Sequence, residues 1–364
     1  MTAADNLADP ARAHGADGQG HADGSEPLDV VAVGSALVDV LAHAGEELLA
    51  RLGLVKGSMS LVDLARAAAV YDALPPATEM SGGSAANTAV GVACLGGAAG
   101  YVGKVAADEL GEVFLHDITA AGVTLGRVDP VPVTDRPAED PDAELATGRC
   151  LVLVTPDGER TMATHLGVAA TLGPGDLDEE LLARAKVTYL EGYLWDLPQA
   201  KHAMRRAMAV AHDADAVVAL SLSDPFCVQR HRREFLELLH GEVDVLFANE
   251  DEVRLLFGAA SFGAAAAAVE ETGLLAALTR GAKGSVVVTA AGLLEVPAEP
   301  VDLVVDTTGA GDLYAAGFLY GLTHGHDPEG CARLGTLAAA EIIGHLGARP
   351  QASLRELAAA AGLL

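Results

Sequence analysis

Short apolar runs alternate with helical patterns along most of this chain, and that alternation limits the folds open to it. From residue 187 onward, strands are predicted near residues 187–190, 216–222, 243–248, 274–279 and 285–289. Helices are predicted near residues 198–212, 230–240, 250–257, 262–271, 310–323, 327–345 and 353–361. Strands separated by helices predict an α/β fold, in which a mostly parallel central sheet carries helices on both faces. Ligands of such folds bind at the carboxyl ends of the strands.

The first half of the chain keeps this pattern with one interruption. Strands are predicted over residues 28–34 and 99–103, and helices over residues 45–52, 61–74, 84–95 and 109–121. Residues 150–165 instead predict two strands joined by the turn Pro156-Asp157-Gly158. We interpret this hairpin as part of a small β-rich lid, formed roughly by residues 37–60 and 126–168.

Local composition sets the limits of the predicted domain. Residues 1–27 are rich in Ala, Asp, Gly and His and are predicted to be a disordered tail. Residues 28–364 then form one domain with its lid, in which the acidic, Pro-rich residues 131–148 are predicted to be a flexible loop. The spacings of the four cysteines resemble neither a zinc site nor a disulfide framework, so buried reduced thiols are expected. These cysteines are Cys94, Cys150, Cys227 and Cys331.

The chain is strongly acidic. Its 364 residues include 23 Lys and Arg against 51 Asp and Glu, which gives a formal net charge of −28. This charge argues against nucleic acid or an anionic membrane as a partner. No apolar run reaches about 18 residues without a polar break, and no secretory signal is visible, so we expect no membrane span and a cytoplasmic protein. The acidic surface favours a monomer, whereas an exposed sheet face on the lid would favour a homodimer, and both stay open.

The run DTTGAGDLYAAGFLYGL places two glycines at the predicted start of an apolar helix near the C-terminus. The free amides of Gly309, Ala310 and Gly311, together with the helix dipole, would form an anion site. Asp312 follows where those amides converge. Its carboxylate can take a proton from a hydroxyl while the amides hold a phosphoryl group in transfer. The alternative interpretation is a tight connection that binds no ligand.

Two common nucleotide-binding patterns do not fit this turn. A strand is predicted over residues 301–305 just before it, as in a dinucleotide-binding unit. Tyr314 nevertheless occupies the position where a G-x-G-x-x-G fingerprint has its third glycine. The sequence contains no G-x-x-x-x-G-K-[ST], so a P-loop is excluded.

Polar residues also follow the first predicted strand and precede the helix predicted over residues 84–95. Asp39, in GSALVDV, can accept hydrogen bonds from two sugar hydroxyls, or it is a helix-capping or loop aspartate. Gly82 and Gly83 allow the backbone to approach a ligand closely. Asn87 lies one turn into an apolar helix, where its amide needs a partner, either a ligand hydroxyl or a backbone carbonyl.

Two further motifs follow predicted strands in the second half of the chain. Asn249 and Glu252 lie three residues apart after a strand and could hold a hydrated Mg²⁺. They could equally cap a helix as a capping box, and the two roles can coexist. The segment TRGAKGS supplies Thr279, Gly281 and Gly284, whose backbone could line a nucleotide, although a plain hairpin turn is an equal alternative.

Together these motifs resemble the ribokinase-like (PfkB) family of carbohydrate and nucleoside kinases. SGGSAANTAVGVACLGG is similar to the N-terminal signature of that family, and DTTGAGDLYAAG is similar to its C-terminal signature. The resemblance covers nearly the whole chain from about residue 28. It implies a ribokinase-like fold, ATP as the phosphoryl donor, and a small-molecule nucleoside or sugar as the acceptor.

The resemblance also implies roles for single residues. Asp312 matches the general base, and residues 309–311 match the anion hole. Asn249 and Glu252 match residues that organise Mg²⁺ near the phosphates of ATP, in the case of Glu252 through water. Residues 279–284 match a segment that lines the nucleotide.

Further roles concern the acceptor and a second cation. The resemblance assigns the sugar to Asp39, Gly83 and Asn87. Asp306 and Thr308 match a segment that often borders a monovalent-cation site, usually for K⁺. Arg160, in DGERTM, lies on the predicted lid and would cover the transferred phosphate.

Within the family the pattern is similar to the adenosine kinase subgroup, as in YLEGYLWD, LSDPFCV and DVLFANEDE. Ser35 stands where an asparagine often grips the nucleoside, and Leu194 stands where some members stack an aromatic ring on the purine. Tyr193 and Trp195 could supply that ring instead. The expected reaction is ATP-dependent phosphorylation of a primary hydroxyl, foremost the 5′-hydroxyl of adenosine. The alternatives are a sugar kinase of ribose or fructose type, an inosine or guanosine kinase, and a nucleoside-binding relative without catalysis.

Overall fold

The computed structural model describes residues 26–127, 129–132 and 146–364. Nearly all of the predicted tail over residues 1–27 lies outside the described residues. The same holds for most of the loop predicted over residues 131–148. Among the described residues no single helix has the length and hydropathy of a membrane span. Within the same residues, only the pair Glu250–Phe257 and Phe262–Glu270, which is bent by 67°, has that length and hydropathy when the two helices are taken together.

The larger of two sheets has nine strands in the order β14-β13-β12-β11-β10-β9-β1-β5-β6. All neighbours from β6 to β12 are parallel, whereas β13 and β14 are antiparallel. This confirms the predicted mostly parallel sheet. The strands are β1 (Leu28–Val33), β5 (Ala99–Val102), β6 (Thr124–Leu125), β9 (Ala185–Glu191), β10 (Val217–Ser221), β11 (Val245–Asn249), β12 (Leu275–Thr279), β13 (Ser285–Thr289) and β14 (Gly292–Val296).

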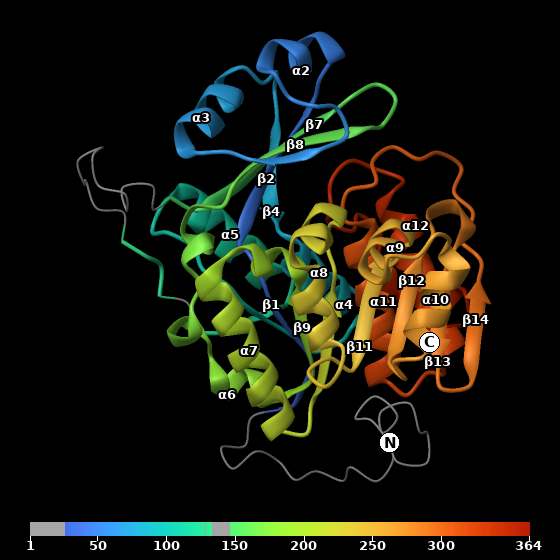
Figure 1. The fold of residues 1–364 in the computed structure, drawn as a ribbon. Helices are drawn as coiled ribbons and strands as arrows, with labels where there is room; N and C mark the ends of the chain where they lie inside the picture. The colour runs from blue at the N-terminus through green and yellow to red at the C-terminus, as the bar shows by residue number, and fades with distance from the viewer. Residues whose placement is uncertain (1–25, 128, 133–145) are drawn as a thin grey trace.

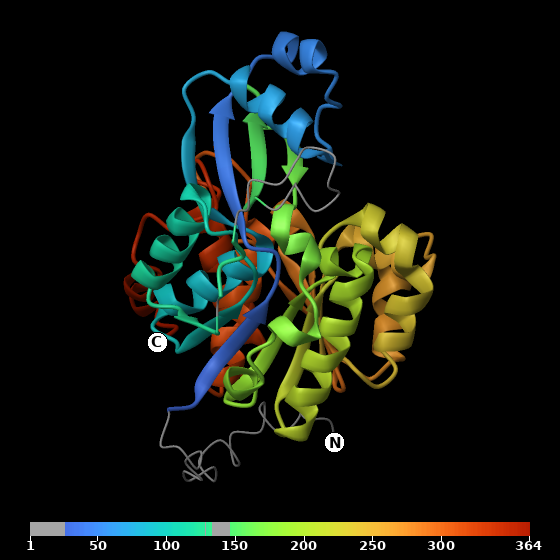
Figure 2. The ribbon, with the colours of Figure 1, turned by 90° about the vertical axis from the view of Figure 1, so that its left-hand side faces the viewer.

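Helices cover both faces of this sheet, as predicted, because alternate side chains of each central strand point to opposite faces. In β1, Val31 and Val33 join one apolar core, and Val30 and Ala32 join another. The first core packs against α6 (Glu179–Leu182), α7 (Pro198–Asp213), α8 (Pro225–Leu238), α9 (Glu250–Phe257) and α10 (Phe262–Glu270). The second packs against α4 (Ser84–Leu95), α5 (Glu109–Ala120), α11 (Ala310–Thr323) and α12 (Pro328–Ile342). Figure 2 shows the two helical layers on either side of the sheet.

The second sheet has five strands in the order β3-β8-β7-β2-β4 and stands over one end of the main body (Figure 1). Its strands are β2 (Leu37–His43), β3 (Met59–Leu61), β4 (Thr78–Gly82), β7 (Gly148–Val154) and β8 (Arg160–His165). Apolar side chains of α2 (Glu46–Leu52) and α3 (Leu64–Asp72) pack on one of its faces. The predicted hairpin is the antiparallel pair β7-β8, closed by a bond from the amide of Thr155 to the carbonyl of Glu159.

The remaining elements are short. They are α13 (Leu354–Ala360) and four 3-10 turns, η1 (Gly167–Thr171), η2 (Pro174–Asp176), η3 (Gly192–Asp196) and η4 (Gly281–Lys283). Leu354 and Ala358 of α13 pack behind α4 and α12 in a third apolar cluster.

Several predicted elements differ from the structure. The second sheet takes in residues 37–82 and 148–165, so its first segment extends beyond residue 60 to include α3 and β4. The strand predicted over residues 301–305 is wrong: this segment is a loop, and the apolar side chains of Leu303 and Val304 are exposed instead of buried in a sheet. Helix α8 begins at residue 225, earlier than predicted, because the side chain of Asp224 caps it and a proline follows as its first residue.

Candidate active site

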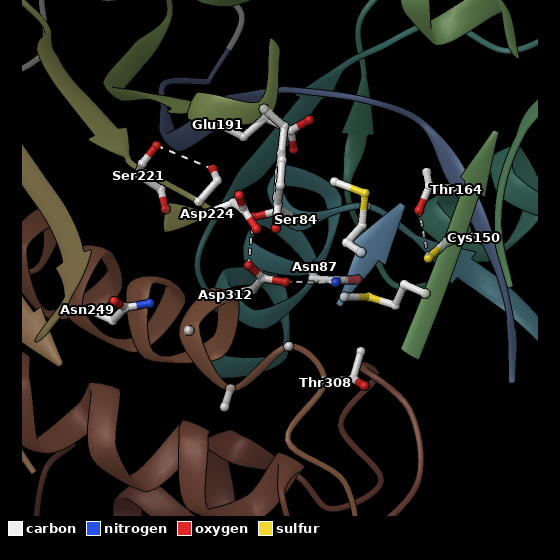
Figure 3. Close-up of a pocket in the computed structure, with 18 of the residues that line it drawn as sticks. Ser84, Asn87, Cys150, Thr164, Glu191, Ser221, Asp224, Asn249, Thr308 and Asp312 are labelled. Carbon is white, nitrogen blue, oxygen red and sulfur yellow. Dashed lines mark hydrogen bonds between the residues drawn. The ribbon is translucent and has the colours of Figure 1, made fainter. Parts of the chain in front are cut away.

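A cavity of about 580 Å³ lies between the carboxyl ends of the main-sheet strands and the second sheet. Residues at the ends of four neighbouring strands contribute to its lining, as expected for this fold class. These are Glu191, Ser221, Asn249 and Thr279. The second sheet contributes residues of β2, β3, β7 and β8, and the starts of α4, α8, α9 and α11 complete the wall. Figure 3 shows that segments distant in sequence meet here.

The start of α11 leaves backbone donors free. Gly309 is the N-cap residue, with a φ of 76° and no side chain to cap the helix. Among the described residues, no acceptor takes the amides of Gly309 and Gly311, and both residues line the cavity. The amide of Ala310 differs from the prediction, since it donates to the carbonyl of Thr307 at 3.3 Å. Two uncommitted amides at a helix N-terminus can bind an anion.

Asp312 lies beside these amides, half-buried on the cavity wall. The hydroxyl of Ser84 donates to its Oδ1 at 2.7 Å, and Nδ2 of Asn87 donates to its Oδ2 at 2.9 Å (Figure 3). Burial raises the pKa of the Asp312 carboxyl, while these two hydrogen bonds and the charges of Arg160 and Arg349 lower it. A carboxylate held by two donors in this way can accept a proton from a bound hydroxyl.

Asp39 is on the opposite, second-sheet side of the cavity. It lies within β2, not in the loop considered as an alternative, because the chain continues from β1 directly into the second sheet. Its side chain is buried, and burial raises its pKa to about 7 against the opposing charge of Arg349. Among the described residues no group donates a hydrogen bond to this carboxylate, so its oxygens are available to a ligand in the cavity.

Of the two glycines before α4, both predicted to approach a ligand, only Gly83 lies on the cavity wall. Gly83 has a φ of 93°, and a Cβ there would lie 2.2 Å from the carbonyl oxygen of Ser35. A Cβ on Gly82 would lie 2.3 Å from Cγ of Asp39. Gly83 lines the cavity, whereas Gly82 lies behind Asp39 and does not. Both positions therefore need glycine for close approach between chain segments.

Asn249 and Glu252 form the capping box considered in the sequence. The amide and Nδ2 of Asn249 donate to the Glu252 carboxylate at 2.9 and 2.7 Å, and the amide of Glu252 donates back to Asn249 at 2.9 Å. Both residues also line the cavity. Burial, with a smaller contribution from the nearby carboxylate of Asp224, raises the pKa of Glu252 to about 7. The carboxylates of Glu252 and Asp224 both line the cavity, and such a pair suits a hydrated divalent cation.

The segment predicted to line a nucleotide divides in two. Thr279 ends β12 and lines the cavity. Gly281 and Gly284 lie in the turn between β12 and β13, outside the lining, as the hairpin alternative required. A Cβ on Gly284 would lie 2.1 Å from the carbonyl oxygen of Val296, so the glycine serves the packing of the hairpin.

The segment between the loop of residues 301–305 and α11 buries an acid. Asp306 is fully buried, and its oxygens accept the amide and hydroxyl of Thr308 at 2.9 and 2.6 Å and the amide of Gly347 at 2.9 Å. No Lys or Arg among the described residues pairs with it. A buried carboxylate without a protein cation has the chemistry of a cation ligand. Thr308 lines the cavity, and Asp306 lies just behind it.

The predicted lid arginine and the aromatic residues fall in different places. Arg160, at the start of β8, and Tyr193 both line the cavity. Trp195 is fully buried, and its indole nitrogen donates to Glu234 at 3.0 Å. The interpretation of Trp195 as a ring that stacks on the ligand is therefore wrong, because the side chain fills the core beneath α7 and α8.

Two charged residues of the site were not predicted from the sequence. Glu191 ends β9 fully buried, and its carboxylate accepts the amides of Ser35 and Ala85 at 2.8 and 2.9 Å. It thereby binds the end of β1 to the start of α4. Arg349 follows α12 and donates to Asn87 at 2.6 Å. An acid that closes an apolar strand, as in YLEGY, is a signal that could have identified Glu191.

Comparisons with known proteins identify the family. The model of the pfkB family carbohydrate kinases matches residues 69–354, so the chain belongs to the PfkB family. The chain is 29% identical over 343 residues to the adenosine kinase of Saccharomyces cerevisiae, which covers 87% of this chain and 95% of that protein. It is 26% identical over 272 residues to a 5-dehydro-2-deoxygluconokinase of Listeria monocytogenes, and this match covers 72% of this chain and 80% of that protein.

Solved structures give the same result. The adenosine kinase from Sinorhizobium meliloti superposes with a TM-score of 0.86 at 47% identity, covering 92% of this chain and 99% of that one. The probable sugar kinase from Rhizobium etli superposes with a TM-score of 0.87 at 44% identity, covering 93% of this chain and 100% of that one. The fold is therefore ribokinase-like, and the chain is an ATP-using phosphotransferase with an alcohol group as acceptor.

Proposed function

We propose that this chain phosphorylates the 5′-hydroxyl of adenosine with ATP and releases AMP and ADP. The observation that carries the chemistry is a half-buried, doubly hydrogen-bonded Asp312 beside the open amides of Gly309 and Gly311. The 47% identity to the adenosine kinase from S. meliloti favours adenosine as the acceptor.

In this proposal Asp312 accepts the proton of the 5′-hydroxyl as the oxygen attacks the γ-phosphorus of ATP. The new bond joins that oxygen to phosphorus, and the bond from phosphorus to the β,γ-bridging oxygen breaks, so that ADP leaves. The amides of Gly309 and Gly311 stabilise the charge on the oxygens of the transferred group. Arg160, on the second sheet, adds a positive charge on the other side of the cavity.

The nucleoside occupies the part of the cavity under the second sheet. Asp39 accepts hydrogen bonds from the ribose hydroxyls, since its carboxylate has no donor among the described residues. Gly83 lets the backbone approach the sugar, and Asn87 borders it. The base lies against the apolar side chains of this region and beside the ring of Tyr193. These apolar side chains are Leu37, Met59, Met162 and Leu166.

Two cations fit the residues on the nucleotide side. Glu252, Asp224 and Asn249 would hold a hydrated Mg²⁺, which neutralises charge on the phosphates when bound. Asp306 and Thr308 would bind K⁺, since Asp306 is a buried carboxylate with no protein cation among the described residues. Thr279 lines the side of the cavity proposed for the adenine nucleotide.

We further propose that the second sheet acts as a lid that closes over the nucleoside and excludes water. The turn between Thr155 and Arg160 stands at its tip and is the natural place to test this. Limited proteolysis there should slow when adenosine is added. Cleavage at an unchanged rate would count against closure.

A sugar kinase is the second candidate, because the probable sugar kinase from R. etli superposes equally well at 44% identity. An assay of ADP release over adenosine, inosine, guanosine, ribose and fructose separates the two. We expect adenosine to give the highest kcat/KM. A higher value for ribose or fructose would replace adenosine by a sugar, and binding of adenosine without turnover of any acceptor would indicate a non-catalytic relative.

A further inference from the structure

Arg349 lies behind the cavity wall and contacts two residues that belong to different parts of the molecule. Its Nη1 donates to Oδ1 of Asn87, in α4, at 2.6 Å. Its Nη2 and Nε donate to the hydroxyl of Ser81, in β4 of the second sheet, at 2.9 and 3.3 Å. Arg349 itself is not among the lining residues. Any influence on a bound substrate would therefore pass through its neighbours.

The contact with Arg349 fixes which way the Asn87 amide points. A guanidinium carries only donors, so it requires the amide oxygen of Asn87 on its side. The amide nitrogen is then directed to the other side, where it donates to Oδ2 of Asp312 at 2.9 Å. If the amide were reversed, its oxygen would face the Asp312 carboxylate and would supply no donor. Arg349, Asn87 and Asp312 thus form one chain of hydrogen bonds with a single direction.

The position of Arg349 is itself set by its surroundings. The backbone amide of Ser81 donates to Oδ2 of Asp117 at 3.0 Å. This hydrogen bond fixes the backbone of Ser81, whose hydroxyl is the one that Arg349 contacts. Two residues before Arg349, the amide of Gly347 donates to Asp306 at 2.9 Å. A Cβ at residue 347 would lie 2.8 Å from Sδ of Met80, so the segment packs closely on β4. Arg349 is therefore held in place at two points, through the backbone two residues before it and through the Ser81 hydroxyl that its guanidinium contacts.

We propose that Arg349 is a positioning residue for phosphoryl transfer, which fixes the amide of Asn87 so that Asp312 is oriented toward the acceptor hydroxyl. This inference rests on the proposed function, because it takes Asp312 as the group that receives the proton. Arg349 touches neither substrate nor the reacting atoms. It acts on the rate of transfer through the hydrogen bond between Asn87 and Asp312.

Arg349 also contributes a charge to the site. The guanidinium lowers the pKa values of both Asp312 and Asp39, against the effect of burial. Removal of this charge should raise the pKa of Asp312. Since Asp312 must be ionised to accept a proton, the acid limb of the pH profile of kcat/KM would then move to higher pH. The charged groups that face Asp312 are Arg160 from β8, Arg349, Asp39 from β2 and Glu191 from β9.

Two substitutions at this position separate geometry from charge. Arg349→Met removes both the hydrogen bonds and the charge, and we expect kcat to fall by about 10²-fold, the effect of misplacing a catalytic group by about 1 Å. The KM for ATP should change little, and the acid limb should shift upward. Arg349→Lys keeps the charge but lacks the planar fork of donors that contacts Asn87 and Ser81 at once, so kcat should fall while the acid limb stays in place. Arg206→Met, at an exposed ion pair with Glu179, is the matched control.

A double-mutant cycle with Asn87→Ala tests the route of the effect. If Arg349 acts through Asn87, Arg349→Met should reduce kcat much less in the Asn87→Ala background than in the wild type. Fully additive losses, or an unchanged kcat in Arg349→Met, would overturn the inference. Should Arg349→Met fail to fold, Ser81→Ala loosens the same guanidinium and should lower kcat, and an unchanged kcat there would likewise overturn it.

The failure of this inference is distinguishable from the failure of the proposed function. Every rate is measured with the acceptor that the wild-type protein turns over best. A wild-type protein without turnover of any acceptor removes the proposed function. An active wild-type protein with an equally active Arg349→Met variant removes only the role of Arg349.

Discussion

Two helices, α9 and α11, begin on the wall of the same cavity, and their first turns are built in opposite ways. At α9 the side chains of Asn249 and Glu252 satisfy each other and the backbone through three hydrogen bonds. At α11 the N-cap is Gly309, which has no side chain, and the amides of Gly309 and Gly311 have no acceptor among the described residues.

This difference follows from the residues at the two starts. A capping box removes free donors from a helix end and leaves carboxylate oxygens facing the cavity. A glycine turn leaves the donors free. One cavity thus has an end suited to a phosphoryl group, at α11, and an end suited to a cation, at α9. The proposed reaction needs both, with the carboxylate of Asp312 beside the phosphoryl group and the acceptor hydroxyl.

The strongest test of the α11 end is Asp312→Asn. We expect turnover to fall by about 10²–10⁴-fold, the range for a lost general base, because an amide cannot accept the hydroxyl proton. Nucleoside affinity, measured by calorimetry, should change little. Asp327→Asn makes the same change at the N-cap of α12, outside the cavity, and should leave turnover intact. Normal turnover in Asp312→Asn would remove Asp312 from its role.

The glycine turn itself is tested by Gly309→Ala. A Cβ there would lie 2.7 Å from Cβ of Ala348 on a backbone with a φ of 76°, so the turn must shift and carry its amides with it. Steady-state assays should show kcat reduced by about 10²-fold, as for a misplacement of about 1 Å. Gly273→Ala has a matching φ of 75° with open space around it, so it should lower stability without lowering kcat. Equal effects of the two substitutions on kcat would contradict an anion site at α11.

The α9 end is tested by Glu252→Gln, which keeps the shape and removes the charge. The Mg²⁺ concentration that half-saturates activity should rise by about tenfold, the size of effect seen when a metal site loses a supporting carboxylate. Glu356→Gln, at the corresponding position of the capped start of α13, is the control. An unchanged Mg²⁺ dependence in Glu252→Gln would leave Glu252 as a helix cap only.

The same substitution has a smaller effect on stability, with a defined pH dependence. Burial raises the pKa of Glu252 from 4.5 to about 7, so the folded protein binds this proton more tightly than the unfolded chain. The contribution of Glu252 to stability is therefore present below pH 4.5 and is lost as the pH rises through about 7. Thermal melting without ligands should show wild type losing stability relative to Glu252→Gln across that window. Parallel curves for the two proteins would contradict a raised pKa.

The sequence predicts the parts of this site that lie within one motif. The glycine turn before Asp312 and the pair of Asn249 and Glu252 each follow from local patterns of helix starts. Arg349 could not be predicted, because it meets Asn87 across 262 positions of sequence, and only the packing of α12 against α4 and α11 brings them together.

Strand patterns show the same limit on the scale of the fold. The main sheet was predictable because its central strands are continuous apolar runs. The prediction of a strand over residues 301–305 is wrong because this segment pairs with no described strand of either sheet, and its apolar residues Leu303 and Val304 are exposed. Asp39 was expected near a strand end and instead lies within β2, since the chain passes from one sheet directly into the other.

The central claim is that the acid at the start of α11 meets the acceptor hydroxyl beside the phosphoryl group. A crystal structure of Asp312→Asn with adenosine and a non-hydrolysable ATP analogue tests this directly. The account predicts the 5′-oxygen within about 3 Å of the residue-312 side chain, the distance of a hydrogen bond, and the terminal phosphate against the amides of Gly309 and Gly311. A 5′-hydroxyl directed away from residue 312, or a phosphate bound elsewhere in the cavity, would contradict it.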